Sequence, residues 1–342
     1  MQGMLISRRE FNRLSLMSGM ALFRFQEDAP RAGIPVSIVK TGNRGMGIRK
    51  AVDLLEPLRL QGREVYLKCN YNSPDPFPAT THPDALRAAV EVLKSSGCGK
   101  ITLVERSGMG VTQDIAERLG VVQIARDIGI NFLPLEQLPP DRWKKPDLKD
   151  SHWKNVPEVP DFILEKGCVV QVCNLKTHRF GGEFSASLKN SIGLVAKYAS
   201  KDPALNYMAE LHSSKEQCSM IAEVNQCYTP ELLIMDAMQV FVQGGPESGR
   251  TADPGFIAAS RDRVALDAVG VAVLRLLGAG APLNKGSCFE QEQIRRAVEL
   301  GLGAGSAAEI RLISDDEESR LFASRIEGIL SDSPVPEKLP PD

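Results

Sequence analysis

The sequence lacks several features that would assign a protein class at once. Its 342 residues contain no uninterrupted apolar run of the roughly 18–20 residues that a membrane-spanning helix needs. Neither sign of charge is in excess, because 41 Lys and Arg residues stand against 43 Asp and Glu residues. With a net charge of -2 and no long basic run, the sequence indicates neither an integral membrane span nor a nucleic-acid-binding surface.

Cysteine is present, but not in the patterns that build a disulfide framework or a metal cluster. The seven cysteines are an odd number, they are scattered along the chain, and no two form a C-x-x-C pair. Zinc sites and ferredoxin-type iron–sulfur clusters use such closely spaced cysteines. The sequence therefore predicts buried free thiols and no ferredoxin-type cluster, and free thiols in this number favour a reducing compartment.

Composition and hydrophobic periodicity indicate an α/β fold. The chain is 43% hydrophobic and 25% charged, and it is long enough to bury a large core. Short β-branched runs alternate with helical stretches throughout, which predicts a doubly wound, mostly parallel sheet with helices on both faces. This pattern leaves open a second α/β lobe. A Pro-rich excursion at residues 136–160 contains both tryptophans, and we expect it to pack on the body of the protein.

The amino-terminal residues resemble a bacterial twin-arginine export signal. Arg8 and Arg9 precede a weakly apolar stretch at residues 14–23, although no A-x-A cleavage site follows. We therefore expect a leader at 1–34, a domain at 35–330 and a tail at 331–342. The pathway carries folded proteins, so free cysteines are compatible with export to the periplasm. The alternative is an attached amphipathic leader on a cytoplasmic protein.

Polar side chains gather after the apolar run at residues 169–173, which is predicted to be a buried strand that ends at residue 173. Lys176 and His178 follow directly, and Lys189 and Asn190 follow a little later. Ligands of open α/β sheets bind beyond the carboxyl ends of the strands, so this stretch predicts a site. The alternative is a solvated loop that caps the next helix.

Other predicted strands and helices also begin or end at polar residues. The strand at 65–68 leads into Lys68 and Asn70, and the strand at 100–105 ends at Glu105. His82 precedes a proline at a predicted helix start, where the helix dipole favours a neutral imidazole. A later apolar strand ends at Asp236. Because strands of one parallel sheet end at one edge, we expect these side chains to converge.

These motifs together resemble a bacterial and archaeal family called domain of unknown function 362, over residues 35 to 305. The resemblance is carried by Lys68-x-Asn70, Thr80-Thr81-His82-Pro83, Glu105, Asn174-Leu175-Lys176-Thr177-His178, Leu188-Lys189-Asn190-x-x-Gly193, Asp236, Gly245-Pro246 and Asp262-x-x-Ala265-Leu266-Asp267. Members are often associated with iron–sulfur proteins, which implies a redox partner, but this chain lacks the C-x-x-C-x-x-C run that some members carry. The layout is also distantly similar to the nickel-dependent lactate racemase family, which indicates the fold only.

Three functions fit these residues. The first is an enzyme for a small anionic substrate, a carboxylate or phosphate ester, in which lysines bind charge and a histidine transfers a proton. The second is a divalent metal site. The third is a protein that binds the same ligand without turnover. The catalytic candidates are His178, Lys176 and His82; the substrate-binding candidates are Lys68, Asn70, Lys189 and Asn190; the metal-ligand candidates are His82, His178, Glu105 and Asp236.

Four polar residues, of which Asp236 is also a metal-ligand candidate, are interpreted as structural or surface residues. His152 lies in the Pro-rich excursion, and His212 lies on a helix, predicted at residues 206–224, with polar neighbours. Asp236 and Asp267 belong to apolar segments, where a buried carboxylate needs partners, so both are expected to anchor the fold rather than to serve the site.

Overall fold

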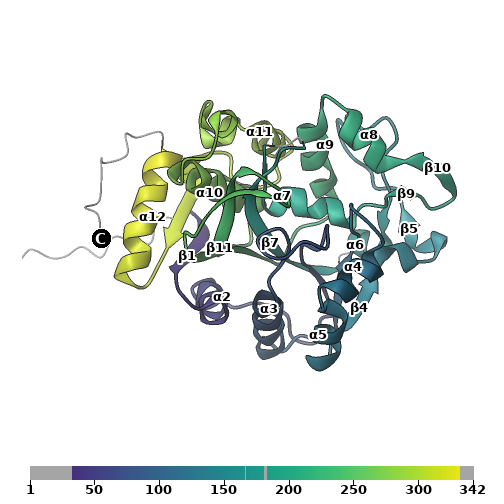
Figure 1. Cartoon of the computed structure of the whole chain (residues 1–342), viewed down its shortest axis with the longest axis horizontal. Coiled ribbons are helices and arrows are strands. Elements are labelled where there is room, and N and C mark those ends of the chain that lie inside the picture. The colour runs from purple at the N-terminus through teal and green to yellow at the C-terminus, as the bar shows by residue number, and fades with distance from the viewer. Residues whose placement is uncertain (1–32, 166, 181–182, 332–342) are drawn as a thin grey trace, which may run out of the picture. The chain divides into compact units, whose positions relative to one another are not determined.

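The computed structural model describes residues 33–165, 167–180 and 183–331, and Figure 1 shows its arrangement. A 10-stranded sheet has the main order β14-β1-β13-β11-β7-β2-β3-β4, with β12 beside β11 and β8 beside β7. Every pairing along the main order is parallel except the two that β13 makes. The mostly parallel sheet is thus confirmed. The predicted leader and tail lie outside the described residues, apart from residues 33, 34 and 331.

The strands of this sheet are β1 (Ile34–Lys40), β2 (Val65–Lys68), β3 (Ile101–Glu105), β4 (Asn131–Pro134), β7 (Cys168–Thr177), β8 (Phe184–Ser185), β11 (Leu232–Gly244), β12 (Gly249–Ala252), β13 (Phe256–Ser260) and β14 (Ile310–Ile313). The α-helices are α2 (Arg44–Asp53), α3 (Pro83–Ser95), α4 (Thr112–Arg118), α5 (Val121–Asp127), α6 (Asp161–Leu164), α7 (Ser187–Asn190), α8 (Tyr207–Ser213), α9 (Gln217–Glu223), α10 (Arg263–Leu276), α11 (Glu292–Glu299) and α12 (Glu317–Leu330). Two small sheets pair β5 (Trp143–Lys144) with β6 (Val159–Pro160), and β9 (Tyr198–Ala199) with β10 (Asp202–Asn206).

Helices cover both faces of the sheet, as Figure 1 shows for α10 on one side and α3 on the other. Successive side chains of a strand point to opposite faces, and β7 follows this rule. Val170 and Val172 belong to the core that includes α2 and α3, whereas Cys173 and Leu175 belong to the core that includes α10 and α12. The described residues form one compact unit without the second lobe that the sequence left open.

Strand β7 is longer than the sequence predicted, and its polar end is not a loop. It continues through Thr177, and all ten of its residues are buried. The extension is stabilised by β8, which pairs antiparallel with Lys176 and Thr177, and by Phe241 of β11, which pairs with Lys176. The end at residue 173 and the solvated-loop alternative are therefore wrong, because the polar side chains are fixed inside the sheet.

The segment at residues 206–224 also differs from the prediction. The helix predicted at 206–224 is two short helices, α8 and α9, because residue 206 ends β10 and residues 214–216 interrupt the helical backbone. The Pro-rich excursion packs against this pair, as expected. Trp153 is 4% exposed, and its indole Nε1 donates to the Met220 carbonyl at 3.1 Å.

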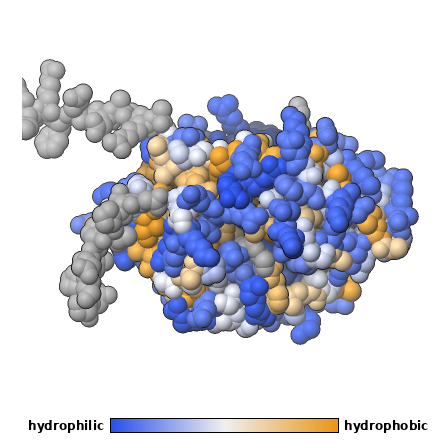
Figure 2. All heavy atoms as spheres, turned by 90° about the horizontal axis from the view of Figure 1, so that it is seen from above, coloured by the Kyte–Doolittle hydropathy of each residue, from blue (hydrophilic) through white to orange (hydrophobic). Residues whose placement is uncertain are grey.

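The surface and the helices agree with the absence of long apolar runs. In the part of the chain that the structure describes, we find no helix with the length and apolarity that crossing a bilayer would require. Figure 2 shows a face on which hydrophilic residues predominate and apolar residues are scattered.

A buried carboxylate on α10 holds the start of α7. Asp267 is fully buried, and its side chain accepts hydrogen bonds from the Ser187 backbone at 2.8 Å and the Leu188 backbone at 3.1 Å. The Ser187 hydroxyl donates to it as well. Burial raises the pKa of Asp267 to about 6. Its predicted role as an anchor fits these contacts, and the anchored segment carries Lys189.

The variant Asp267→Ala tests this anchor. It leaves two backbone N–H groups at the start of α7 without their acceptor, so we expect the free energy of unfolding to fall by about 2–4 kcal/mol. Urea denaturation at pH 7 measures the change. Asp127→Ala is the control, because Asp127 is exposed and accepts a hydrogen bond from the exposed Gln123 side chain, and it should change stability by less than about 0.5 kcal/mol. Equal losses in both variants would contradict the anchor.

Candidate functional site

A cavity of about 690 Å³ lies at the carboxyl ends of β2, β3 and β7. Seven of the nine residues predicted for the site line it: Lys68, Asn70, Glu105, Lys176, His178, Lys189 and Asn190. Strand ends supply the first five, and α7 supplies the last two. The expected convergence at one edge of the sheet is therefore present for these seven residues.

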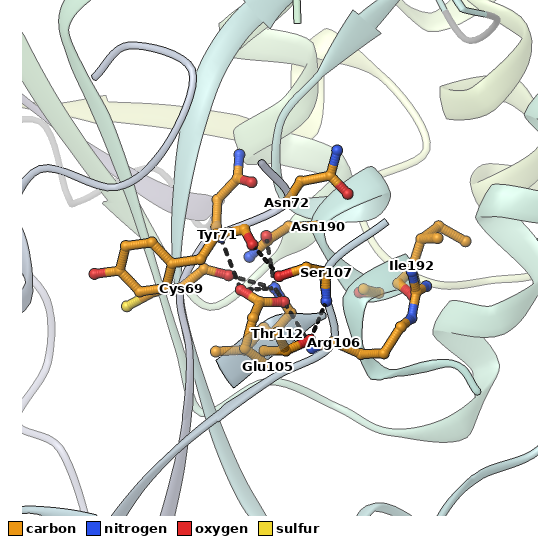
Figure 3. Close-up of polar contacts among 12 residues, drawn as sticks. Cys69, Tyr71, Asn72, Glu105, Arg106, Ser107, Thr112, Asn190 and Ile192 are labelled. Atoms are coloured by element: carbon orange, nitrogen blue, oxygen red, sulfur yellow. Dashed lines mark hydrogen bonds and ion pairs between the residues drawn. The ribbon is translucent and has the colours of Figure 1, made fainter. Parts of the chain in front are cut away.

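A buried ion pair forms one wall of the cavity. The Lys68 ammonium lies 2.7 Å from Glu105 Oε1 and donates to Oε2 at 2.9 Å and to Asn190 Oδ1 at 3.3 Å. Glu105 also accepts from the backbone N–H groups of Tyr71 and Arg106 at 2.8 and 3.0 Å (Figure 3). Burial raises the pKa of Glu105 despite these partners. Both side chains are nearly inaccessible to water, so the pair neutralises itself and fixes the geometry of the wall.

Gly193 approaches this ion pair so closely that no side chain fits there. A Cβ atom at this position would lie 2.4 Å from Lys68 Cε and 2.7 Å from Glu105 Oε1. The Gly193 carbonyl also accepts from the Arg106 N–H at 3.1 Å. The L-K-N-x-x-G motif thus places Lys189 and Asn190 on the cavity and brings the following backbone onto the ion pair.

The loop before α3 is held by residues of β7. Lys176 is 3% exposed, and its ammonium donates to the Ala79 carbonyl. Asn174 Nδ2 donates to the Thr80 carbonyl at 3.2 Å. Burial, and secondarily the charge of Lys189, lowers the pKa of Lys176 to about 7. The T-T-H-P and N-L-K-T-H motifs therefore meet in space, and Lys176 titrates near neutral pH.

His178 and Lys189 form the second titratable pair on the cavity. Lys189 Nζ lies 3.2 Å from His178 Nδ1, and the Phe180 N–H donates to the same nitrogen at 3.2 Å. Burial and the neighbouring Lys189 keep the pKa of His178 well below its usual value, so the ring is neutral. Because Nδ1 accepts, Nε2 carries the proton. Burial also lowers the pKa of Lys189 to about 7.

His212 and Arg106 are among the cavity-lining residues that were not assigned to the site from the sequence. His212 of α8 lines the cavity, although it is exposed, and its Nδ1 lies 3.1 Å from Gln217 Nε2. Burial, and then Lys189 and Arg106, lower its pKa. Arg106 is 3% exposed and donates to the Val195 carbonyl at 2.8 Å. The signal for Arg106 was its position after β3, whereas the interruption that separates α8 from α9 has no clear sequence signal.

Two predicted site residues do not line the cavity. His82 caps α3, where its Nδ1 accepts from the Asp84 N–H at 3.1 Å. Its pKa is lowered as predicted, but the causes are burial and then the charge of Arg44. Asp236 is fully buried and bonds Arg44 Nε at 2.8 Å. Arg44 thus interacts with both residues, and neither lines the cavity.

The four metal-ligand candidates are not gathered around one point. In residues 33–165, 167–180 and 183–331, we find no group of three or more His, Cys, Asp and Glu side chains arranged to hold a metal ion. Glu105 is bonded to Lys68, and Asp236 is bonded to Arg44. The donor set at the cavity is dominated by amines and guanidinium, which do not fit a divalent cation.

The close approach of Gly193 gives a direct test of the wall. In Gly193→Ala the new methyl group must displace Lys68 or Glu105, and we expect the free energy of unfolding to fall by about 2–4 kcal/mol. The control is Gly328→Ala in α12, where no atom lies within 4 Å of the new Cβ, and which should gain about 0.5–1 kcal/mol. Chemical denaturation measures both. An unchanged stability in Gly193→Ala would contradict the packing described.

Comparisons with known proteins place these motifs in a wider context. The family model described as "Domain of unknown function (DUF362)" matches residues 65–272. A thylakoid-associated protein of Synechocystis sp. is 26% identical over 229 residues, which cover 67% of this chain and 64% of that protein. The match thus spans less than two thirds of that relative's length.

Two solved structures resemble the chain coarsely. The lactate racemase apoprotein from Thermoanaerobacterium thermosaccharolyticum is 12% identical with a TM-score of 0.37, over 61% of this chain and 52% of that one. A protein from Thermotoga maritima is 13% identical with the same TM-score, over 56% and 49% of the two chains. At this level of similarity neither structure informs the chemistry of the cavity.

Proposed function

Because the chain belongs to the DUF362 family, whose description assigns no activity, we propose its function from the cavity: it binds a small anionic ligand, a carboxylate or a phosphate. Lys176 and Lys189 bind the negative charge, and His178 donates a hydrogen bond and transfers a proton. Lys68 and Asn190 hold the geometry of the wall, and Asn70 orients the ligand.

The observation that carries this proposal is the charge of the lining residues. Five lysine or arginine residues line the cavity among the residues that the structure describes: Lys68, Arg106, Lys176, Lys189 and Lys197. Glu105 is the single carboxylate in the same lining, and it is bonded to Lys68. A cavity with this excess of cations attracts an anion from solution and orients it by charge-assisted hydrogen bonds.

The lowered pKa values of Lys176 and Lys189 couple ligand binding to proton uptake. Each amine has a pKa of about 7, so at pH 8 most of it is neutral. A bound anion stabilises the protonated form and raises both pKa values, which means that binding takes up protons. An amine with a pKa near 7 is also matched to proton transfer at neutral pH, and Lys189 lies 3.2 Å from His178.

The other assignments made from the sequence have different support. The catalytic role of His82 stays a prediction, because its side chain caps α3 away from the cavity wall. The metal alternative finds no gathered donor set among the described residues to support it. A redox partner, which the family resemblance implies, likewise stays a prediction.

Anion affinity should depend on both lysines and on pH. We expect Lys176→Met and Lys189→Met each to weaken phosphate or acetate binding about 10-fold to 100-fold, because each removes a charge-assisted hydrogen bond. In the unmodified protein the affinity should weaken as pH rises through about 7, where the amines lose their protons. Isothermal titration calorimetry measures both effects. The control is Lys201→Met, since Lys201 is exposed and does not line the cavity.

Proton uptake separates this site from a surface that attracts anions weakly. Phosphate or acetate titrations in buffers of different ionisation enthalpy should show net proton uptake at pH 8 and little at pH 5.5, where the amines are already protonated. Absence of uptake at pH 8, with binding intact, would contradict the role of the two lysines. Loss of turnover in His178→Ala with binding retained would distinguish an enzyme from a binding protein once a reacting ligand is found.

We also propose that the protein is exported through the twin-arginine pathway, as Arg8 and Arg9 indicate. The name of the Synechocystis relative associates that protein with thylakoids, which supports a location outside the cytoplasm for this one. Replacing both arginines with lysine should shift the protein from the periplasmic to the cytoplasmic fraction. An unchanged periplasmic fraction in that double variant would reject the pathway, and a cytoplasmic location of the unmodified protein would reject export.

A further inference from the structure

We propose that the ligand is amphipathic: an anionic group at Lys176 and Lys189 is joined to an apolar body that lies along α8. This inference rests on the proposed anion site and narrows its ligand class to carboxylates or phosphates that carry an aliphatic or aromatic body. It follows from a second group of lining residues, which the anion site does not use.

The second group is apolar and comes from different elements than the lysines. Met208 and Leu211 of α8, Ile221 of α9 and Ile192 of the turn after α7 all line the cavity. None of these side chains can donate a hydrogen bond to an anion. A site that served only a small polar anion would gain nothing from an apolar wall of this extent.

One face of α8 joins the two groups. Leu211 and His212 follow Met208 by three and four residues, so the three side chains lie on the same side of the helix. The apolar part of this face is fixed, because Met208 and Leu211 are 7% and 2% exposed, and Met208 Sδ lies 3.2 Å from the Arg106 guanidinium. Burial, and secondarily the charge of Lys189, lowers the pKa of His212, which favours the neutral, polar imidazole. The wall therefore changes from apolar to polar along a single helix face.

The rim of the cavity extends the apolar surface. Met109 and Phe180 line the cavity and are nevertheless 54% and 49% exposed. Large apolar side chains left half in water beside a cavity are expected where a ligand covers them. An apolar body that extends outward from the lysines would bury both side chains.

The size of the cavity agrees with a ligand of this kind. Its volume of about 690 Å³ falls within the range of about 300–1,000 Å³ typical of pockets for drug-sized ligands. Acetate or phosphate would leave most of this space to water. The volume and the two kinds of wall together favour one molecule with a charged end and an apolar end.

A series of straight-chain carboxylates from acetate to octanoate tests the inference by calorimetry at pH 6.5 and constant ionic strength. Each methylene group that is buried contributes about 0.8 kcal/mol, so we expect the affinity to rise about three-fold to four-fold per methylene. Met109→Gln should weaken octanoate binding several-fold and leave acetate binding unchanged. Met46→Gln is the matched control, because Met46 is 58% exposed and does not line the cavity, and it should change neither.

The outcomes separate this inference from the anion site itself. Equal affinity for acetate and octanoate, with both lost in Lys189→Met, would overturn the apolar body and leave the anion site intact. No binding of any carboxylate would reject the anion site as well. Octanol binding as tightly as octanoate, with no effect of Lys189→Met, would overturn the joined ligand. Met208→Gln, checked for an unchanged melting temperature, should repeat the result of Met109→Gln from the buried end of the wall.

Discussion

The buried ion pair of Lys68 and Glu105 is the constraint on which the candidate site depends. Taking two charges out of water is costly, and such a pair persists only when further hydrogen bonds satisfy both partners. Here the backbone N–H groups after β2 and β3 and the Asn190 side chain supply them. The pair therefore joins two strand ends to α7, and Gly193 has no side chain because the backbone must pass against it. Much of the spacing within the sequence motifs follows from this contact.

The sequence predicted the elements whose pattern is local. The strand at 65–68 was predicted with the bounds observed, since its apolar run is visible in a short window. Lys176, His178 and Lys189 were placed at one edge by the general behaviour of parallel strands. The length of β7 was missed, because polar residues normally mark a loop and its extension depends on pairing with β8 and β11.

What the sequence could not show is the distance between groups that are far apart along the chain. His212 of α8 lines the cavity beside residues that precede it by more than 100 positions, and Asp236 forms an ion pair with Arg44, 192 residues away. Charged residues at strand ends look alike in a sequence, whether they pair with each other or line a cavity. Packing alone decides that Glu105 has a lysine as its ion-pair partner, whereas Lys176 and Lys189 line the cavity with pKa values of about 7.

The hydrogen bond from Lys176 to the Ala79 carbonyl has one more consequence. A neutral amine still carries hydrogens, so this bond can persist when Lys176 loses its proton, and the loop before α3 is also held by Asn174 through Thr80. The backbone around the site therefore does not have to rearrange when the amine titrates. A rigid wall of this kind can alternate between two charge states during one binding cycle, with its electrostatic potential switching while its shape stays constant.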